Sequence, residues 1–151
     1  MRIPIVQTQL VDCGFADIET ESPYVYGVES AKDLFHAMIG RLSLEAVGLL
    51  CMDSAHRIVN YSVIGLGQAN KVVPSVSQVM RTALLSNASY IMIAHNHPSG
   101  ICEITEPDIE MTKRIGSAAR IMDIVLIDSL VVCPSGECVS IRERIGVKHE
   151  P

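Results

Sequence analysis

Three side chains that commonly bind metal ions stand close together in the sequence, at His95, His97 and Asp108. In an extended segment, residues i and i+2 point to the same side, so the two imidazoles can aim at one point. Asp108 follows after a short loop and adds a carboxylate. Two neutral imidazoles and one carboxylate suit a zinc ion that keeps its fourth position open for water. The pattern therefore predicts a catalytic zinc site.

The segments on either side of the histidines predict how these ligands are positioned. The apolar run 90–94 is typical of a strand buried on both faces, and its carboxyl end is where ligand sites of α/β sheets concentrate. Thr105 begins a helix as its N-cap, with Pro107 in the first turn and Asp108 at the capping-box position. Apolar residues recur at helical spacing as far as Met122, which gives this helix a face to bury. We expect the strand and the helix together to hold the ligands.

The order His-x-His, seven residues, Thr105, two residues, Asp108 resembles the JAMM metalloprotease motif, also called MPN+ or JAB. The longer run His-Asn-His-Pro-Ser-Gly, with Leu-Leu-Cys-Met-Asp before it and Ser-Gly-Glu-x-Val-Ser after it, is more narrowly similar to the RadC branch of that family. The similarity extends from about Ser30 to Gly146. The family usually has Ser at the third motif position, where Thr105 keeps the hydroxyl and adds a methyl group.

The resemblance implies roles for two further residues. The family has a glutamate just before an aliphatic strand upstream of the zinc ligands, and Glu45, which precedes the aliphatic residues 46–50, matches that place. Glu45 would be the general base that acts on a zinc-activated water, and the Thr105 hydroxyl would help to stabilise the oxyanion. The family resemblance thus implies a zinc metallopeptidase that cleaves a peptide or isopeptide bond in a protein or peptide substrate.

The order of apolar segments and turn residues predicts the fold. Strands are expected over 46–52, 57–64, 90–94, 124–127, 130–133 and 138–141, and helices over 30–40, 76–84 and 105–122. This order indicates a three-layer α/β/α sandwich with a mixed β-sheet, which is the JAB architecture and resembles that of cytidine deaminases. The length of 151 residues suits an N-terminal arm or edge strand over 1–28 and one RadC-like domain over 29–151.

Composition restricts the cellular setting. No apolar run is long enough to span a bilayer and residues 1–4 lack the features of a signal peptide, so we expect a cytoplasmic protein with no membrane partner. Five cysteines without a regular pattern then indicate reduced thiols. Cys102, close to the predicted site, could be an adventitious ligand or an oxidation-sensitive thiol. The pattern is compatible with a homo-oligomer.

Two functions from other classes stand beside the peptidase. RadC proteins bear a DNA-repair name, so the chain could be a DNA-repair or mobile-element accessory protein. It could also be a non-catalytic JAB-type module that engages protein partners, although inactive relatives typically lose ligands and this chain has the full set. A net charge of −5, from 12 basic and 17 acidic residues, argues against unaided DNA binding.

We expect binding to duplex DNA to be weak and salt-sensitive, or undetectable, because dispersed Lys and Arg side chains provide few phosphate contacts. Fluorescence anisotropy of a labelled duplex at physiological salt measures the affinity. Submicromolar affinity that persists at this salt concentration would favour the DNA-repair function over the peptidase.

Overall fold

A five-stranded sheet forms the centre of the computed structural model, which describes residues 3–5, 7–18, 22–67 and 74–146. The strand order is β2-β1-β3-β4-β5. The strands are β1 (Ala46–Met52), β2 (Ile58–Leu66), β3 (Tyr90–Asn96), β4 (Val125–Val132) and β5 (Cys138–Ser140). β3 and β4 are parallel, whereas the other neighbouring strands are antiparallel. The sheet is therefore mixed, as predicted.

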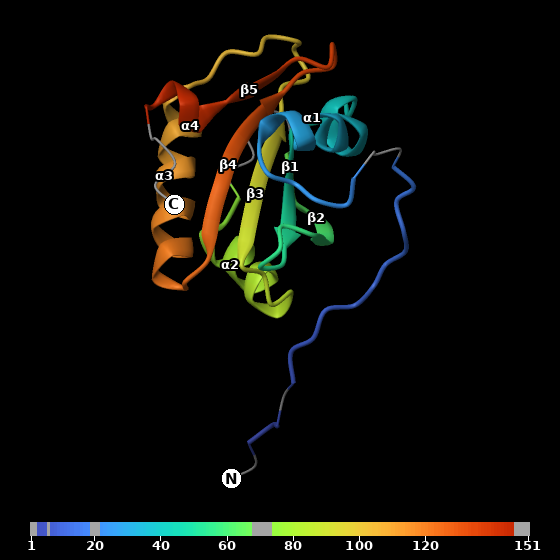
Figure 1. Cartoon of the computed structure of the whole chain (residues 1–151), viewed down its shortest axis with the longest axis vertical. Coiled ribbons are helices and arrows are strands. Elements are labelled where there is room, and N and C mark those ends of the chain that lie inside the picture. The colour runs from blue at the N-terminus through green and yellow to red at the C-terminus, as the bar shows by residue number, and fades with distance from the viewer. Residues whose placement is uncertain (1–2, 6, 19–21, 68–73, 147–151) are drawn as a thin grey trace.

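Helices cover both faces of the sheet (Figure 1). α2 (Val76–Leu85) and α3 (Glu106–Ile121) pack on one face, and α1 (Val28–Phe35) with the π-helix η1 (His36–Gly40) packs on the other. A short helix, α4 (Ile141–Arg144), follows β5. Among the helices of the described residues, none has the length and apolar character needed to cross a membrane. The predicted three-layer α/β/α fold is confirmed.

Alternating side chains along β1 explain the two hydrophobic cores. Val47 and Leu49 belong to the core beneath α2 and α3, whereas Leu50 and Met52 belong to the core beneath α1 and η1. All seven residues of β1 are buried, because the strand has a neighbour on each side and helices over each face. Burial on both faces therefore fixes β1 as an inner strand.

β4 is one strand where the sequence predicted two. Asp128 and Ser129 interrupt the apolar pattern, yet both are buried. The Asp128 carboxylate accepts hydrogen bonds from the Ser129 N–H at 2.7 Å and the Ser140 hydroxyl at 2.7 Å. A third, longer one comes from the Arg142 N–H at 3.4 Å. Because these donors compensate the loss of water around the carboxylate, Asp128 can stay inside the strand and the strand continues.

Other differences concern the ends of elements. The helix expected over 30–40 is α-helical only as far as Phe35 and continues as η1. The strand expected to reach 141 ends at Ser140, whose hydroxyl oxygen accepts a hydrogen bond from the Glu143 N–H at 3.0 Å and so begins α4. β3 extends two residues beyond the predicted end, to Asn96. His95 therefore lies within the strand.

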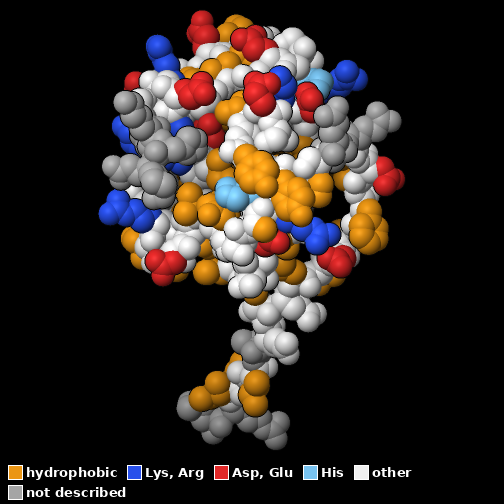
Figure 2. Space-filling model, in the orientation of Figure 1, with side chains coloured by type: hydrophobic (Ala, Val, Ile, Leu, Met, Phe, Trp, Pro, Cys, Tyr) orange, Lys and Arg blue, Asp and Glu red, His pale blue; other side chains and the backbone are white. Residues whose placement is uncertain are grey.

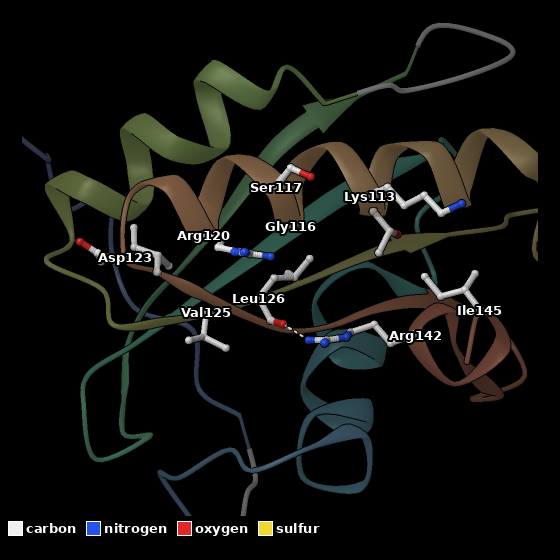
Figure 3. A pocket seen from close by; sticks show the side chains of 11 residues that line it. Lys113, Gly116, Ser117, Arg120, Asp123, Val125, Leu126, Arg142 and Ile145 are labelled. Atoms are coloured by element: carbon white, nitrogen blue, oxygen red, sulfur yellow. Dashed lines mark hydrogen bonds between the residues drawn. The ribbon is translucent and has the colours of Figure 1, made fainter. Parts of the chain in front are cut away.

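The first half of β4 has an outer edge that Arg142 covers. β5 pairs only with residues 130–132 of β4. Nη1 of Arg142 donates to the carbonyl oxygen of Leu126 and, at 3.0 Å, to that of Ile127. Figure 3 shows this guanidinium opposite α3, in a groove that Lys113 and Arg120 also line. Arg142 thus occupies carbonyl groups that could otherwise pair with a strand of another chain.

Residues 23–25 attach the N-terminal segment to the β1–β2 hairpin. Tyr24 forms an isolated antiparallel bridge with Arg57. The rings of Tyr26, His56 and Tyr90 contact one another in turn, with centroids 5.0 and 3.9 Å apart. Figure 2 shows hydrophobic side chains gathered around a histidine near the middle of one face of the molecule. The described residues between 3 and 18 contain no helix or strand and lead away from the sheet (Figure 1).

We expect Asp128→Ala to lower the free energy of unfolding by about 1–3 kcal/mol, because it leaves the buried Ser129 N–H and Ser140 hydroxyl without their acceptor. Urea unfolding followed by circular dichroism measures this change. Asp12→Ala is the control, since Asp12 is exposed in the N-terminal segment and its replacement should change stability by less than about 0.5 kcal/mol. Equal stabilities for the two variants would contradict the role given to Asp128.

Candidate metal centre

Two elements bring the three predicted ligands to one point. His95 lies near the end of β3, and Asp108 is the third residue of α3. Nε2 of His95 lies 3.1 Å from Oδ1 of Asp108 and 3.1 Å from Nε2 of His97. Candidate ligand atoms of the three residues all lie within 4.8 Å of one another. The structure therefore groups His95, His97 and Asp108 as a single metal ion requires.

A backbone carbonyl orients His97. Its Nδ1 lies 2.8 Å from the carbonyl oxygen of Ile101. Because a carbonyl can only accept, Nδ1 carries the proton, and the neutral imidazole presents Nε2 as the bare nitrogen. That nitrogen lies 3.1 Å from Nε2 of His95, which in turn lies 3.1 Å from Oδ1 of Asp108, so candidate ligand atoms of the three residues converge on one region. A bound cation stabilises such an arrangement, and the donor set of these residues fits one.

The two carboxylate oxygens of Asp108 have different partners. Oδ1 faces His95, whereas Oδ2 accepts hydrogen bonds from the Thr105 N–H and the Thr105 hydroxyl, both at 2.7 Å. Partial burial alone would raise the pKa of Asp108, but the contacts with His95 and Thr105 hold it well below its usual range. The position in the first turn of α3 also favours negative charge. Asp108 is therefore ionised at neutral pH, as a metal ligand must be.

Thr105 is the N-cap of α3, as predicted. Its hydroxyl donates to Asp108, so in this structure the hydroxyl proton points to a candidate ligand. Thr105 also lines the cavity that contains the ligand group. The geometry thus gives Thr105 a role in holding Asp108, and its catalytic role stays a prediction.

Glu45 lines the same cavity, which has a volume of about 290 Å³. It stands directly before β1, and the antiparallel pairing of β1 with β3 places Val47 opposite His95. Strand pairing therefore brings Glu45 near ligands that are distant from it in the sequence. Glu45 is half-buried and is not a member of the group of ligands. Its role as a general base stays a prediction.

A disulfide joins Cys102 to Cys133, with Cα atoms 5.9 Å apart. The expectation of reduced thiols is therefore wrong for these two residues, and Cys102 is not an adventitious ligand in this structure. Among the described residues, Cys13, Cys51 and Cys138 have free thiols. Disulfides in cytosolic proteins are usually transient or redox-sensing, so a lasting disulfide here would argue against the predicted cytoplasmic location. The location stays a prediction.

The backbone explains why Cys102 and Cys133 meet. The His97 N–H donates to the carbonyl oxygen of Val132 at 2.9 Å, so the loop after β3 begins beside the end of β4. The disulfide then fixes the residue next to Ile101, whose carbonyl orients His97. The cysteines are 31 residues apart, and only the fold shows that they are neighbours.

Two residues that support the site were not predicted. Ile101 acts through its backbone carbonyl, which the type of side chain does not indicate. Asn96, between the two histidines, is fully buried, and its side chain bonds to the first residue of β1 and to the segment before it. Its signal in the sequence is a polar side chain within an apolar strand, which must find partners when it is buried.

Comparison with known proteins agrees with this geometry. Residues 25–147 match the model of the RadC-like JAB domain, and the chain belongs to that family. It is 32% identical over 102 residues to the UPF0758 protein of Acidithiobacillus ferrooxidans, an alignment that covers 68% of this chain and 45% of that protein. It is 34% identical over 113 residues to the UPF0758 protein of Cellvibrio japonicus, covering 75% of this chain and 50% of that protein. The chain thus spans about half the length of these relatives, whose names state no activity.

We expect reduction of the Cys102–Cys133 disulfide to weaken the affinity for a divalent metal ion about tenfold, because residues that orient ligands typically contribute 10- to 100-fold. Chelator competition measures the affinity, and mass spectrometry of alkylated protein reports the disulfide. The double replacement Cys102→Ser with Cys133→Ser should reproduce the effect of reduction.

Two further variants serve as the negative and positive controls for this measurement. Cys13→Ser should leave the affinity unchanged, since Cys13 is exposed in the N-terminal segment, and His97→Ala should abolish specific binding. Equal affinities for the oxidised and reduced protein would show that the disulfide does not act on the site.

Proposed function

We propose that this chain is a zinc-dependent, metallopeptidase-type hydrolase that cleaves an amide bond in a protein or peptide substrate. The observation that carries the proposal is the convergence of His95, His97 and Asp108 in a cavity that Glu45 also lines. Two imidazole nitrogens and one carboxylate are the ligands of many catalytic zinc sites that keep one position open. Membership of the RadC-like JAB domain family agrees with this chemistry.

His97 and Asp108 would have distinct tasks when zinc is bound. Zinc supplies Lewis acidity, which activates water at neutral pH and polarises a carbonyl group. His97 presents Nε2 because its Nδ1 proton is engaged with Ile101. Asp108 contributes the negative charge, and its second oxygen is held by Thr105. These outer contacts fix the directions of His97 and Asp108 and so favour a single coordination geometry.

Glu45 would transfer the proton. A carboxylate beside the attacking water can accept its proton and then deliver that proton to the leaving nitrogen of the amide. Since Glu45 is outside the group of ligands, proton transfer and metal binding fall to different residues. Replacement of Glu45 should therefore separate the two.

Thr105 would stabilise the oxyanion. Both of its donors contact the same oxygen of Asp108 in this structure. If the hydroxyl turned towards a substrate carbonyl, the backbone N–H would still hold the carboxylate. Donors aimed at a developing oxyanion typically contribute a factor of about 10² to 10³ to turnover.

The cavity restricts the form of the substrate. Its volume of about 290 Å³ is at the lower end of the range for ligand sites, roughly 300–1,000 Å³. An extended peptide segment or a flexible tail can place one amide group there, whereas the compact part of a folded protein cannot enter. The proposed substrate is therefore a protein or peptide that presents the scissile bond in an extended segment.

We expect Glu45→Gln to keep the fold and the zinc content while lowering turnover by a factor on the order of 10² to 10⁴, because it removes the base and leaves the ligands. Asp108→Asn should instead lower zinc retention itself. The measurement pairs zinc stoichiometry, by elemental analysis, with hydrolysis of a library of peptides and isopeptides.

Glu110→Gln is the matched control, since Glu110 is an exposed glutamate on α3 that does not line the cavity. A Glu45→Gln protein as active as the parent would remove Glu45 from the mechanism. A parent protein that binds zinc but hydrolyses none of the library would contradict the peptidase proposal for these substrates.

A further inference from the structure

Asn96 lies between the two histidine ligands in the sequence, but its side chain points to the opposite side of the strand. Successive side chains of a β-strand alternate between faces, so the Asn96 amide points away from the side of His95. It is fully buried, with 0% of its surface exposed. A buried amide needs hydrogen-bond partners, and all those that the structure gives Asn96 lie in one segment, residues 42–46.

Two of the three hydrogen bonds of Asn96 lie on either side of Glu45 in the chain. Oδ1 accepts from the Ala46 N–H at 2.6 Å, and this N–H belongs to the peptide group after Glu45. Nδ2 donates to the carbonyl oxygen of Leu44 at 3.1 Å, and this carbonyl belongs to the peptide group before Glu45. A second Nδ2 bond, to the carbonyl oxygen of Leu42 at 3.2 Å, holds the preceding turn. One side chain therefore fixes both peptide groups that flank the Cα atom of Glu45.

The pairing of β1 with β3 does not hold residues 42–46 in place. The ladder between β1 and β3 begins at Val47 and His95, beyond Glu45. On the other side, the carbonyl oxygen of Glu45 accepts from the Gly67 N–H at 2.7 Å. Residues 41–44 are exposed and lie outside helices and strands. The bonds from Asn96 thus continue the connection to β3 for the residues that the ladder does not reach.

We propose that Asn96 is the positioning residue for Glu45: its amide fixes the backbone on both sides of the general base relative to the strand that carries His95. The inference rests on the proposed function, since Glu45 is a general base only if the chain hydrolyses amides. Proton transfer requires hydrogen-bond distance, and a displacement of about 1 Å can lower a rate on the order of 10²-fold. Asn96 therefore acts on turnover through Glu45 and does not touch the substrate.

The amide of Asn96 is specific for this task, because it combines an acceptor with two donors. Asn96→Asp keeps an acceptor of the same size for the Ala46 N–H but loses both donors to the carbonyl groups of Leu42 and Leu44. Asn96→Gln keeps the amide on a longer side chain. Asn96→Ala removes all three bonds. The series separates loss of volume from loss of donors.

The first measurement is independent of catalysis. Hydrogen exchange by NMR reports the protection of the Ala46 amide, and chelator competition reports the zinc dissociation constant. We expect Asn96→Ala and Asn96→Asp to exchange faster in residues 42–46 while the dissociation constant changes less than about threefold, because the hydrogen bonds of the Asn96 side chain go to residues 42–46 and not to a ligand. Unchanged protection of this segment in both variants would overturn the proposal, even if the parent protein proves not to be a peptidase.

The second measurement is turnover. Asn96→Ala should lower kcat on the order of 10- to 100-fold with little change in KM, and Asn96→Gln should recover part of the loss. In the Glu45→Gln background, Asn96→Ala should lower kcat less than about threefold further, because the residue it positions is already inactive. A full additional loss in that background, or a parallel loss of zinc affinity and kcat, would show a structural role and overturn the proposal.

Asn60→Ala is the matched control. Asn60 is also an asparagine within a strand, and its Nδ2 donates to the Ser86 hydroxyl at 2.9 Å, away from the cavity. It should change global stability without the local increase in exchange at Ala46. If Asn96→Ala does not fold, Asn96→Ser carries the same test, since it removes the amide without placing a charge in this buried position.

Discussion

The antiparallel pairing of β1 with β3 is the interaction on which the rest of the site depends. It sets Val47 opposite His95, and every inner residue of both strands is buried between two layers of helices. A shift of the register by one residue would turn each apolar side chain to the wrong core and would move Glu45 away from the ligands. The hydrophobic effect that stabilises the sheet therefore also sets the distance between Glu45 and the candidate ligands.

The other half of the site depends on the start of α3. Thr105 ends the loop after β3 and begins the helix, and Asp108 in the first turn faces back towards His95. The loop itself is tied to the end of β4 by a backbone hydrogen bond from His97 and by the Cys102–Cys133 disulfide. His97 and Asp108 thus each have a partner outside the ligand group that fixes their direction, which favours an ordered metal site.

The sequence predicted what depends on local pattern. His95, His97 and Asp108 could be assigned because strand alternation and helix capping act over a few residues. Glu45 could be proposed only from the family resemblance, since one glutamate before a strand has no distinctive pattern. The pairing of Cys102 with Cys133 and the bonds of Asp128 and Asn96 join segments far apart in the chain. Such contacts follow from the tertiary fold, and Asp128 shows how buried hydrogen bonds can override a local break in hydrophobicity.

The two roles of the Asp108 carboxylate couple metal binding to the folding of α3. One oxygen accepts the hydrogen bonds that hold the first turn of this helix, and the other faces His95, where a metal ion would bind. A ligand that binds only the ordered form stabilises it, by about 2.7 kcal/mol when the free ligand is at 100 times its dissociation constant. By the same linkage, any contact that opens the start of α3 favours release of the ion. The affinity for a metal ion and the stability of the first turn of α3 are therefore linked, so a molecule that binds the outer surface of this turn would change the affinity for the ion.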